Sequence, residues 1–202
     1  MGWSKRIRRF THSSPLPGTL VKFILNLFLI SEKVDMVCWP RSDERSHHLI
    51  KVLNAKKGSV FDFAVENGPK GKGTVDRLDE HEIIILFKWN DFINPSFLPV
   101  NLIVGLSRPQ TCRKILEQAT TLGVRSFHFF SAKKGESSYA SSTLWTTNEW
   151  KSRIRNGVEQ AFCSHLPDCK IHPNLGSIIQ NIPQKDRHRI AFDNYEADMP
   201  FK

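Results

Sequence analysis

The sequence changes its pattern near residue 99, and this change restricts the possible folds more than any other feature. Up to residue 91, short apolar segments alternate with tight turns, a pattern typical of antiparallel β-structure. From Pro99 on, strand-like and helix-like segments alternate, which predicts parallel strands joined by right-handed crossovers. We therefore predict a β-domain over residues 23–91, followed by an α/β domain over residues 99–202.

The first domain is expected to be a small closed β-barrel, because each of its segments has one apolar face. Residues 31–40 are interpreted as a polar connection and residues 90–98 as a linker. Residues 1–22 are basic, contain prolines and lack periodicity, which predicts a disordered arm. The predicted strands of this domain are 23–30, 60–65, 74–78 and 83–89.

One helix is predicted within this domain, over residues 43–55, with Ser42 as its N-terminal cap. Its core-facing residues would be Leu49, Val52 and Leu53. A glycine-rich segment follows the second strand. We interpret its glycines as hairpin glycines, since no helix follows them as a nucleotide-binding motif would require; they are Gly68, Gly71 and Gly73.

In the second domain, strands are predicted at residues 101–106 and 124–130, near 169–172, and at 189–192. Pro109 suits a helix start and Gly123 a helix end, so a helix should lie between them. Thr146 and Glu149 have capping-box spacing and should begin the next helix. The apolar face of that helix would consist of Trp150, Ile154, Val158 and Ala161.

The chain is strongly basic, with a net charge of +9, and this favours an anionic partner such as nucleic acid or a lipid surface. The apolar run at 23–30 is far shorter than the roughly 20 residues that cross a bilayer, so no membrane span is predicted. The four cysteines form no CxxC pair, which fits reduced thiols and a cytoplasmic protein. Only the basic first nine residues favour the alternative of a secreted or membrane-attached protein.

Several ordered segments resemble one bacterial family. They are Arg45-Ser-His-His-Leu-Ile-Lys-Val-Leu53, Leu106-Ser-Arg-Pro109, the serine-rich segment Ser131–Tyr139, and Glu159-Gln160 ahead of Leu166-Pro167. In this order they resemble the 16S rRNA (uridine-N3) methyltransferases of the SPOUT class, also called the RsmE type. The resemblance extends from about residue 26 to about residue 182.

The resemblance implies a PUA-like barrel followed by an incomplete SPOUT (alpha/beta knot) methyltransferase domain. It implies N3-methylation of a uridine in 16S rRNA of the small ribosomal subunit, S-adenosylmethionine as methyl donor, and a homodimer. The family's terminal "G-P-E-G-G" and "L-G-x-x-I-L-R-x-E-T-A" segments have no counterpart in this sequence. The chain is therefore expected to be C-terminally truncated, and neither donor-binding nor catalytic residues are assigned.

Two groups of basic residues are predicted to contact RNA phosphates. The first lies at i, i+3 spacing on the first-domain helix, where the alternative is an ordinary polar helix face; it comprises Arg45, His48 and Lys51. The second lies in the loops after two predicted parallel strands, where ligands of α/β sheets bind. Its members are Arg108, Lys133 and Lys134, for which the alternative is plain solvated surface.

Other polar and aromatic residues have weaker functional interpretations. Tyr139 and Trp145 have the chemistry to stack on an unpaired base, but core packing is favoured. A structural role is also favoured for Glu159-Gln160. A possible zinc set has non-standard spacing, and no metal is predicted; it consists of Cys163, His165, Cys169 and His172. The rival to an enzyme is a non-catalytic RNA-binding module.

Overall fold

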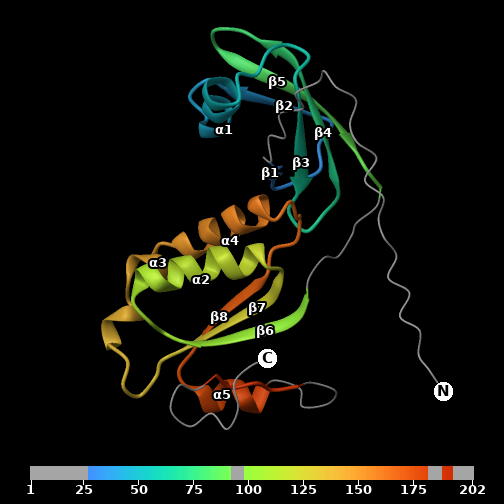
Figure 1. Ribbon diagram of the computed structural model, residues 1–202. Helices are drawn as coiled ribbons and strands as arrows, with labels where there is room; N and C mark the ends of the chain where they lie inside the picture. Colours follow the sequence, from blue (N-terminus) through green and yellow to red (C-terminus); the bar gives the residue numbers. More distant parts are fainter. Residues whose placement is uncertain (1–26, 92–97, 182–187, 193–202) are drawn as a thin grey trace, which may run out of the picture.

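The computed structural model describes residues 27–91, 98–181 and 188–192 and contains two β-sheets (Figure 1). The strands of the first sheet are β1 (Leu27–Ile30), β2 (Met36–Pro40), β3 (Val60–Val65), β4 (Lys70–Leu78) and β5 (Glu82–Trp89). Those of the second are β6 (Leu98–Gly105), β7 (Val124–Phe130) and β8 (Asp168–His172). The helices are α1 (Glu44–His47), the π-helix η1 (His48–Val52), α2 (Pro109–Thr121), the 3₁₀-helix η2 (Ser137–Tyr139), α3 (Thr143–Thr146), α4 (Glu149–Gln160) and α5 (Leu175–Asn181).

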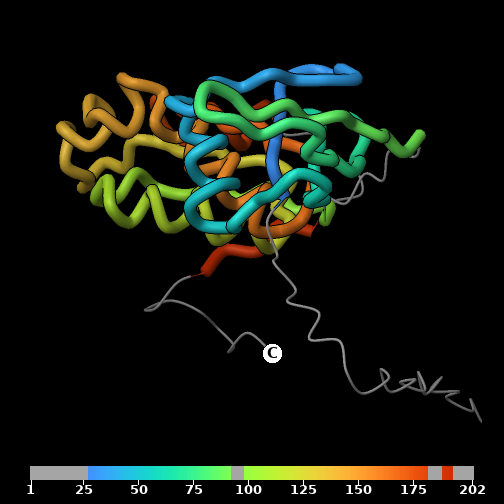
Figure 2. Tube along the Cα trace, turned by 90° about the horizontal axis from the view of Figure 1, so that it is seen from above, coloured from blue at the N-terminus to red at the C-terminus, as the bar shows by residue number. Residues whose placement is uncertain are grey.

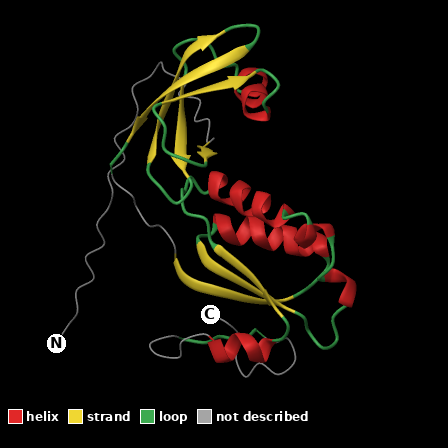
Figure 3. Ribbon diagram, turned by 180° about the vertical axis from the view of Figure 1, so that it is seen from behind, coloured by secondary structure: helices red, strands yellow, loops and turns green. Residues whose placement is uncertain are grey.

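The first sheet is a curled mixed sheet with the strand order β1-β3-β4-β5-β2 (Figure 3). Strands β1 and β3 are parallel, and the other neighbours are antiparallel. The predicted closed barrel is corrected to an open sheet, because β1 and β2 are its edges and are not paired with each other in the described residues. Instead of further strands, α1 and η1 pack against this sheet, where Leu49 joins a core around Phe63 and Ile85.

Strand β2 lies within the segment that we interpreted as a polar connection, so that interpretation was wrong. It is an edge strand, paired with β5 alone, and Trp39 is its one buried residue. Burial along β2 alternates, with Val37 and Trp39 facing the core, but the exposed positions are Met36, Cys38 and Pro40, so the sequence shows no alternation of apolar and polar residues.

The predicted helix at residues 43–55 is shorter and is wound differently. Asp43 replaces Ser42 as its cap, because the carboxylate of Asp43 accepts a hydrogen bond from the backbone N–H of Arg45. After His47 the helix continues as a π-turn, which rotates the later side chains relative to an α-helix. Leu49 is buried, as predicted, and Leu53 packs against the same core, whereas Val52, also expected in the core, is 58% exposed.

Two of the expected hairpin glycines lie inside a strand. Gly68 precedes β4, but Gly71 and Gly73 belong to it. A Cβ atom at Gly73 would lie 2.5 Å from a ring carbon of Phe63, and one at Gly71 would lie 2.5 Å from a backbone oxygen of β5. These two glycines therefore permit close packing over the sheet.

The second sheet consists of three parallel strands in the order β6-β7-β8, which confirms the parallel arrangement predicted for residues 101–106 and 124–130. Helices α2 and α4 cover one face of this sheet, and α5 lies on the opposite side (Figures 1 and 3). The core beneath α2 and α4 contains Phe127 and Phe129 of β7, Leu116 of α2 and Ile154 of α4. An α/β architecture is therefore present, as the sequence predicted.

Helix α2 begins at Pro109 and ends just before Gly123, whose φ of +86° lies in the left-handed region that favours glycine. Helix α4 has a different start from the one predicted. Thr146 lies at the end of α3, and Asn148, with φ +60°, occupies the cap position without a side-chain hydrogen bond. The capping-box prediction was wrong because the carboxylate of Glu149 is engaged by arginine side chains instead.

The strand predicted at residues 189–192 is absent from the described residues 188–192. Ile190 and Phe192 are 63% and 77% exposed, so this segment has no apolar face in the core to hold it in a sheet. Among the described residues, no helix is both long enough and apolar enough to cross a membrane.

The first sheet lies over one end of the helical layer, whereas α3 and the adjacent ends of α2 and α4 extend beyond it (Figure 2). The two parts are joined through β1 and α4. The Leu29 N–H donates to Glu159 Oε1 over 3.1 Å, and an Arg155 guanidinium N–H donates to the Leu29 carbonyl over 3.1 Å. Leu27 and Leu29 also enter the core of the α/β part, so the junction is both apolar and hydrogen-bonded.

Candidate functional site

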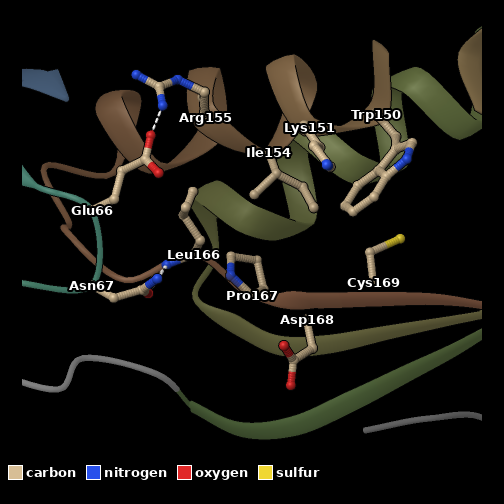
Figure 4. A pocket seen from close by; sticks show the side chains of 10 residues that line it. All are labelled: Glu66, Asn67, Trp150, Lys151, Ile154, Arg155, Leu166, Pro167, Asp168 and Cys169. Carbon is tan, nitrogen blue, oxygen red and sulfur yellow. Dashed lines mark hydrogen bonds and ion pairs between the residues drawn. The ribbon is translucent and has the colours of Figure 1, made fainter. Parts of the chain in front are cut away.

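A cavity of about 340 Å³ lies where the first sheet, α4 and the start of β8 meet (Figure 4). Helix α4 forms one wall of the cavity and the segment leading into β8 forms the opposite wall. The turn between β3 and β4 closes one end. The lining residues are Glu66, Asn67, Trp150, Lys151, Ile154, Arg155, Leu166, Pro167, Asp168 and Cys169.

The position of α4 is set by its contacts with α2. Ile154 and Val158 are buried in the shared core, which leaves Lys151 exposed beside the cavity. At the start of α4, Arg113 of α2 donates to both carboxylate oxygens of Glu149, over 2.8 and 2.7 Å. Hydrogen bonds from Arg113, and then from Arg153, lower the pKa of Glu149 to about 2. The carboxylate therefore stays ionised and holds the two helices together.

The wall that α4 contributes combines an aromatic ring with a cation. Trp150 is half-buried, and the Lys151 ammonium lies 5.5 Å from the centre of its ring. Leu166 and Pro167 face α4 across the cavity, and the Cys169 side chain points toward the indole (Figure 4). Burial raises the pKa of Cys169 to about 12, so its thiol is uncharged and acts as part of the apolar wall.

Contacts between the turn that joins β3 to β4 and the α/β part of the chain close one end of the cavity. Glu66 forms an ion pair with Arg155. Asn67, with φ +54°, donates its backbone N–H to the Ser164 carbonyl over 2.7 Å and accepts the Leu166 N–H on Oδ1 over 2.9 Å. The cavity is thus framed by residues from both parts of the chain.

A second cavity, of about 270 Å³, lies on another side of the junction. His48 contributes its ring there, packed edge-on against Phe28 at 5.5 Å between ring centres. Burial raises the pKa of Glu159, which also lines this cavity, while the hydrogen bond from the Leu29 N–H opposes that shift. With Glu117 also in its lining, the second cavity is rich in carboxylates and is less suited to an anionic ligand than the first.

The two groups of basic residues predicted to bind RNA lie in different parts of the structure. In the first group, Arg45 pairs with Asp43 and its guanidinium lies 4.1 Å from the Trp39 ring centre. Hydrogen bonding to Asp43 raises the pKa of Arg45. His48 lines the second cavity, whereas Lys51 is exposed.

In the second group, Arg108, Lys133 and Lys134 are all exposed. Arg108 follows β6 and the two lysines follow β7, and these strands are parallel neighbours. The three cations therefore lie at the same edge of the second sheet, the edge formed by the carboxyl ends of its strands. Neither of the two cavities described above lies at this edge.

A chain of polar contacts crosses the second sheet on the face away from α2 and α4. Ser126 Oγ donates to Asn101 Oδ1 over 2.6 Å and lies 3.1 Å from His128 Nε2. His128 Nδ1 in turn lies 3.1 Å from His172 Nε2. Burial, followed by the nearby His172, lowers the pKa of His128, so this ring tends to remain neutral.

The other residues that the sequence singled out lie mainly in packed positions. Trp145 is buried and Tyr139 packs against the same core, as favoured by the sequence. Glu159 joins α4 to β1, which agrees with a structural role. Within the described part of the chain, no three His, Cys, Asp or Glu side chains gather closely enough to hold a metal ion.

The sequence did not indicate the cavity of Figure 4. Trp150 was expected only as a core residue, Leu166 was named only as part of the family resemblance, and Lys151 was not singled out. The available signal was Lys151 directly after an aromatic residue on a helix, which is too common to indicate a binding site. Only the fold brings this pair opposite a segment that is distant in the sequence.

Comparison with known proteins identifies the family of the α/β part. Residues 94–201 match the family model described as an RNA methyltransferase domain. The ribosomal RNA small subunit methyltransferase E of Treponema pallidum is 30% identical over 125 residues, which cover 62% of this chain and 47% of that protein. The chain thus spans about half the length of this curated relative.

Solved structures show the same fold. The ribosomal RNA small subunit methyltransferase E of Neisseria gonorrhoeae, bound to S-adenosyl methionine, superposes with a TM-score of 0.62 at 16% identity, covering 79% of this chain and 66% of that one. A predicted RNA methyltransferase of Thermotoga maritima superposes with a TM-score of 0.55 at 19% identity, covering 74% and 66%. Because the family model matches more than half of the sequence, the chain belongs to the RNA methyltransferase domain family, as the resemblance in its motifs predicted.

Proposed function

We propose that this protein is a ribosomal RNA small subunit methyltransferase that uses S-adenosylmethionine to methylate N3 of a uridine in 16S rRNA. The family match over residues 94–201 carries this proposal, and the name of the Treponema relative supports the small-subunit target. The uridine N3 target rests on the motif resemblance. Action as a homodimer in the cytoplasm, a PUA-like first domain and a knotted second domain belong to the same proposal.

Contacts with RNA are proposed for the two groups of basic residues. The cations at the carboxyl edge of the second sheet, Arg108, Lys133 and Lys134, would hold phosphates near the site of methyl transfer. Arg45, His48 and Lys51 would contact a more distant part of the RNA. Phosphate contacts of this kind orient RNA without reading its sequence, so neither group by itself selects a uridine.

S-adenosylmethionine supplies an electrophilic methyl group, and open α/β sheets bind ligands beyond the carboxyl ends of their strands. The two cavities described above lie beside α4 and not at that edge, and no donor-binding residue is assigned in this chain. The exposed basic residues at this edge also suit a second candidate function, a non-catalytic RNA-binding module, because phosphate contacts need no methyl donor.

One experiment separates the two candidates. The purified chain is incubated with radiolabelled S-adenosylmethionine and small ribosomal subunits that lack the modification, and donor binding is measured in parallel by calorimetry. An enzyme should bind the donor saturably and label 16S rRNA, with 3-methyluridine detected by mass spectrometry. Salt-sensitive RNA binding without donor binding or labelling would refute the enzyme and support the RNA-binding module.

A further inference from the structure

We propose that the cavity between α4 and the start of β8 binds one unpaired nucleotide of an RNA strand, with its base against Trp150 and a phosphate near Lys151. This inference rests on the proposed function only in that the ligand is RNA. It applies equally to an enzyme and to an RNA-binding module. The site is separate from the carboxyl edge of the second sheet, because its lining includes the first residues of β8, at the opposite end of that strand.

The size and shape of the cavity suit a single flat ring system. Its volume of about 340 Å³ lies at the lower end of the range of about 300–1,000 Å³ that is usual for small-ligand pockets. The indole of Trp150 borders it on the side of α4, and Leu166 and Pro167 border it on the opposite side (Figure 4). A base between these surfaces would contact apolar groups on both of its faces.

Stacking on an aromatic side chain is the usual way in which proteins hold unpaired bases. It tolerates any base, because every base has a π-face. A double-stranded helix cannot place a base in this cavity, since its bases are stacked within the duplex. The cavity therefore selects a base in a loop, a bulge or a single strand.

The charges around the cavity favour a phosphate. The Lys151 side chain is exposed and, within the described ranges, forms no ion pair. The carboxylate of Glu66 is neutralised by Arg155, and the Asp168 side chain points away from the cavity (Figure 4). Lys151 thus supplies the uncompensated charge beside the stacking surface.

The position of the cavity between two parts of the chain gives it a further property. Glu66 and Asn67 come from the turn between β3 and β4 of the first sheet, whereas Trp150 and Lys151 come from α4. A nucleotide in the cavity would touch both parts. An RNA strand bound there would therefore reach the α/β part in a fixed orientation.

The test uses fluorescence anisotropy with a labelled single-stranded oligouridylate of eight nucleotides, titrated with the full chain at several salt concentrations. Removing the indole by Trp150→Ala should weaken binding about tenfold or more, the usual effect of losing one base–aromatic stack, whereas Trp150→Phe should retain most of the affinity. Lys151→Ala should weaken binding and reduce the slope of log affinity against log salt by about one.

The matched control for Lys151→Ala is Lys57→Ala, which removes an exposed lysine that lines neither cavity. When Lys57→Ala is combined with Trp150→Ala, the loss of affinity caused by Trp150→Ala should stay unchanged. The folding of each variant is checked by circular dichroism and thermal melting. If Trp150→Ala does not fold, Trp150→Phe and the exposed-site variant Lys151→Glu carry the test, and Lys151→Glu should weaken binding more than Lys151→Ala.

The outcomes separate this inference from the proposed function. Folded Trp150 and Lys151 variants that bind the oligonucleotide like the parent would overturn the inference and leave the function standing. A parent chain that binds no RNA would refute both. Competition by uridine monophosphate shows whether the cavity takes a nucleotide of an RNA strand or a free nucleotide. If uridine monophosphate displaces the oligonucleotide only weakly, the ligand is an RNA strand. If it binds as tightly as the oligonucleotide, the RNA assignment is overturned in favour of a free nucleotide.

Discussion

Replacing Gly157 by alanine should destabilise the protein, although alanine is the better helix former. Gly157 is buried where α4 crosses α2. A Cβ atom there would lie 2.5 Å from the Glu117 carbonyl oxygen and 2.7 Å from Thr120 Cβ. Ordinary contacts begin at 3.4 Å, so the two helices would have to separate by about 0.9 Å, the difference between 3.4 and 2.5 Å.

The magnitude follows from two opposing effects. Overpacking a well-packed core costs about 1–3 kcal/mol, and the conflict with a backbone atom places this substitution in the upper part of that range. Exchanging glycine for alanine inside a helix returns about 1 kcal/mol. The expected net loss in the free energy of unfolding is about 1–2 kcal/mol, equivalent to a fall in Tm of about 2–8 °C for a chain of this size.

The assay is urea unfolding followed by circular dichroism, with thermal melting as a second measure. Gly105→Ala is the matched control, because the nearest atom to a Cβ at Gly105 is 3.6 Å away and the glycine ends a strand. The control should stay within about 0.5 kcal/mol of the parent. A Gly157→Ala variant as stable as the parent would show that α2 and α4 separate without cost, and the reasoning about their close approach would fail.

Three further predictions concern charge and the junction. Burial lowers the pKa of His128, so the unfolded chain binds more protons than the folded chain at low pH. The free energy of unfolding should therefore be fully present above about pH 6.5 and decline below it. In urea unfolding at a series of pH values, His128→Gln should reduce this decline. Hydrogen bonds, led by that from Arg113, lower the pKa of Glu149 to about 2, so its ionised carboxylate should contribute stability above about pH 4.5 that is lost toward pH 2. Glu149→Gln should remove this acid dependence without affecting the pH 6 region. Asn67→Gly keeps the left-handed backbone accessible but removes the acceptor for the Leu166 N–H, so hydrogen exchange at the Leu166 amide should accelerate. Asn67→Asp should preserve the protection of that amide. Equal exchange rates in both variants would contradict the contact.

The α/β part was largely predictable because its signals are local. Strand β7 has the predicted bounds, Val124–Phe130, and Pro109 and Gly123 bracket α2 as expected. A proline at a helix start and a glycine just beyond its end each act through their own backbone geometry. Such signals can be read without knowledge of the partners.

The failures of prediction have a common physical origin in tertiary contacts. Strand β2 exists because β5 offers it an edge, and the π-turn η1 leaves Val52 outside the core that Leu49 enters as predicted. Neither follows from local propensity or period. The open first sheet likewise depends on a helix packing against it.

The candidate cavity depends even more on distant contacts. Asn67 and Leu166, which define its end, are 99 positions apart. Trp150 was correctly placed on an apolar helix face, but that face also borders a cavity, and this second role depends on the segment before β8. A sequence pattern can indicate which side chains are buried on a helix, but it cannot indicate where their packing is incomplete.

The hydrogen bonds at Leu29 have a consequence for self-association. Strand β1 is an outer strand of its sheet, and such strands readily recruit strands of other molecules through unpaired backbone groups. Here the side chains of Glu159 and Arg155 occupy both backbone groups of Leu29. Helix α4 thereby blocks that edge, and loosening it from β1 would open a template for intermolecular β-pairing and aggregation.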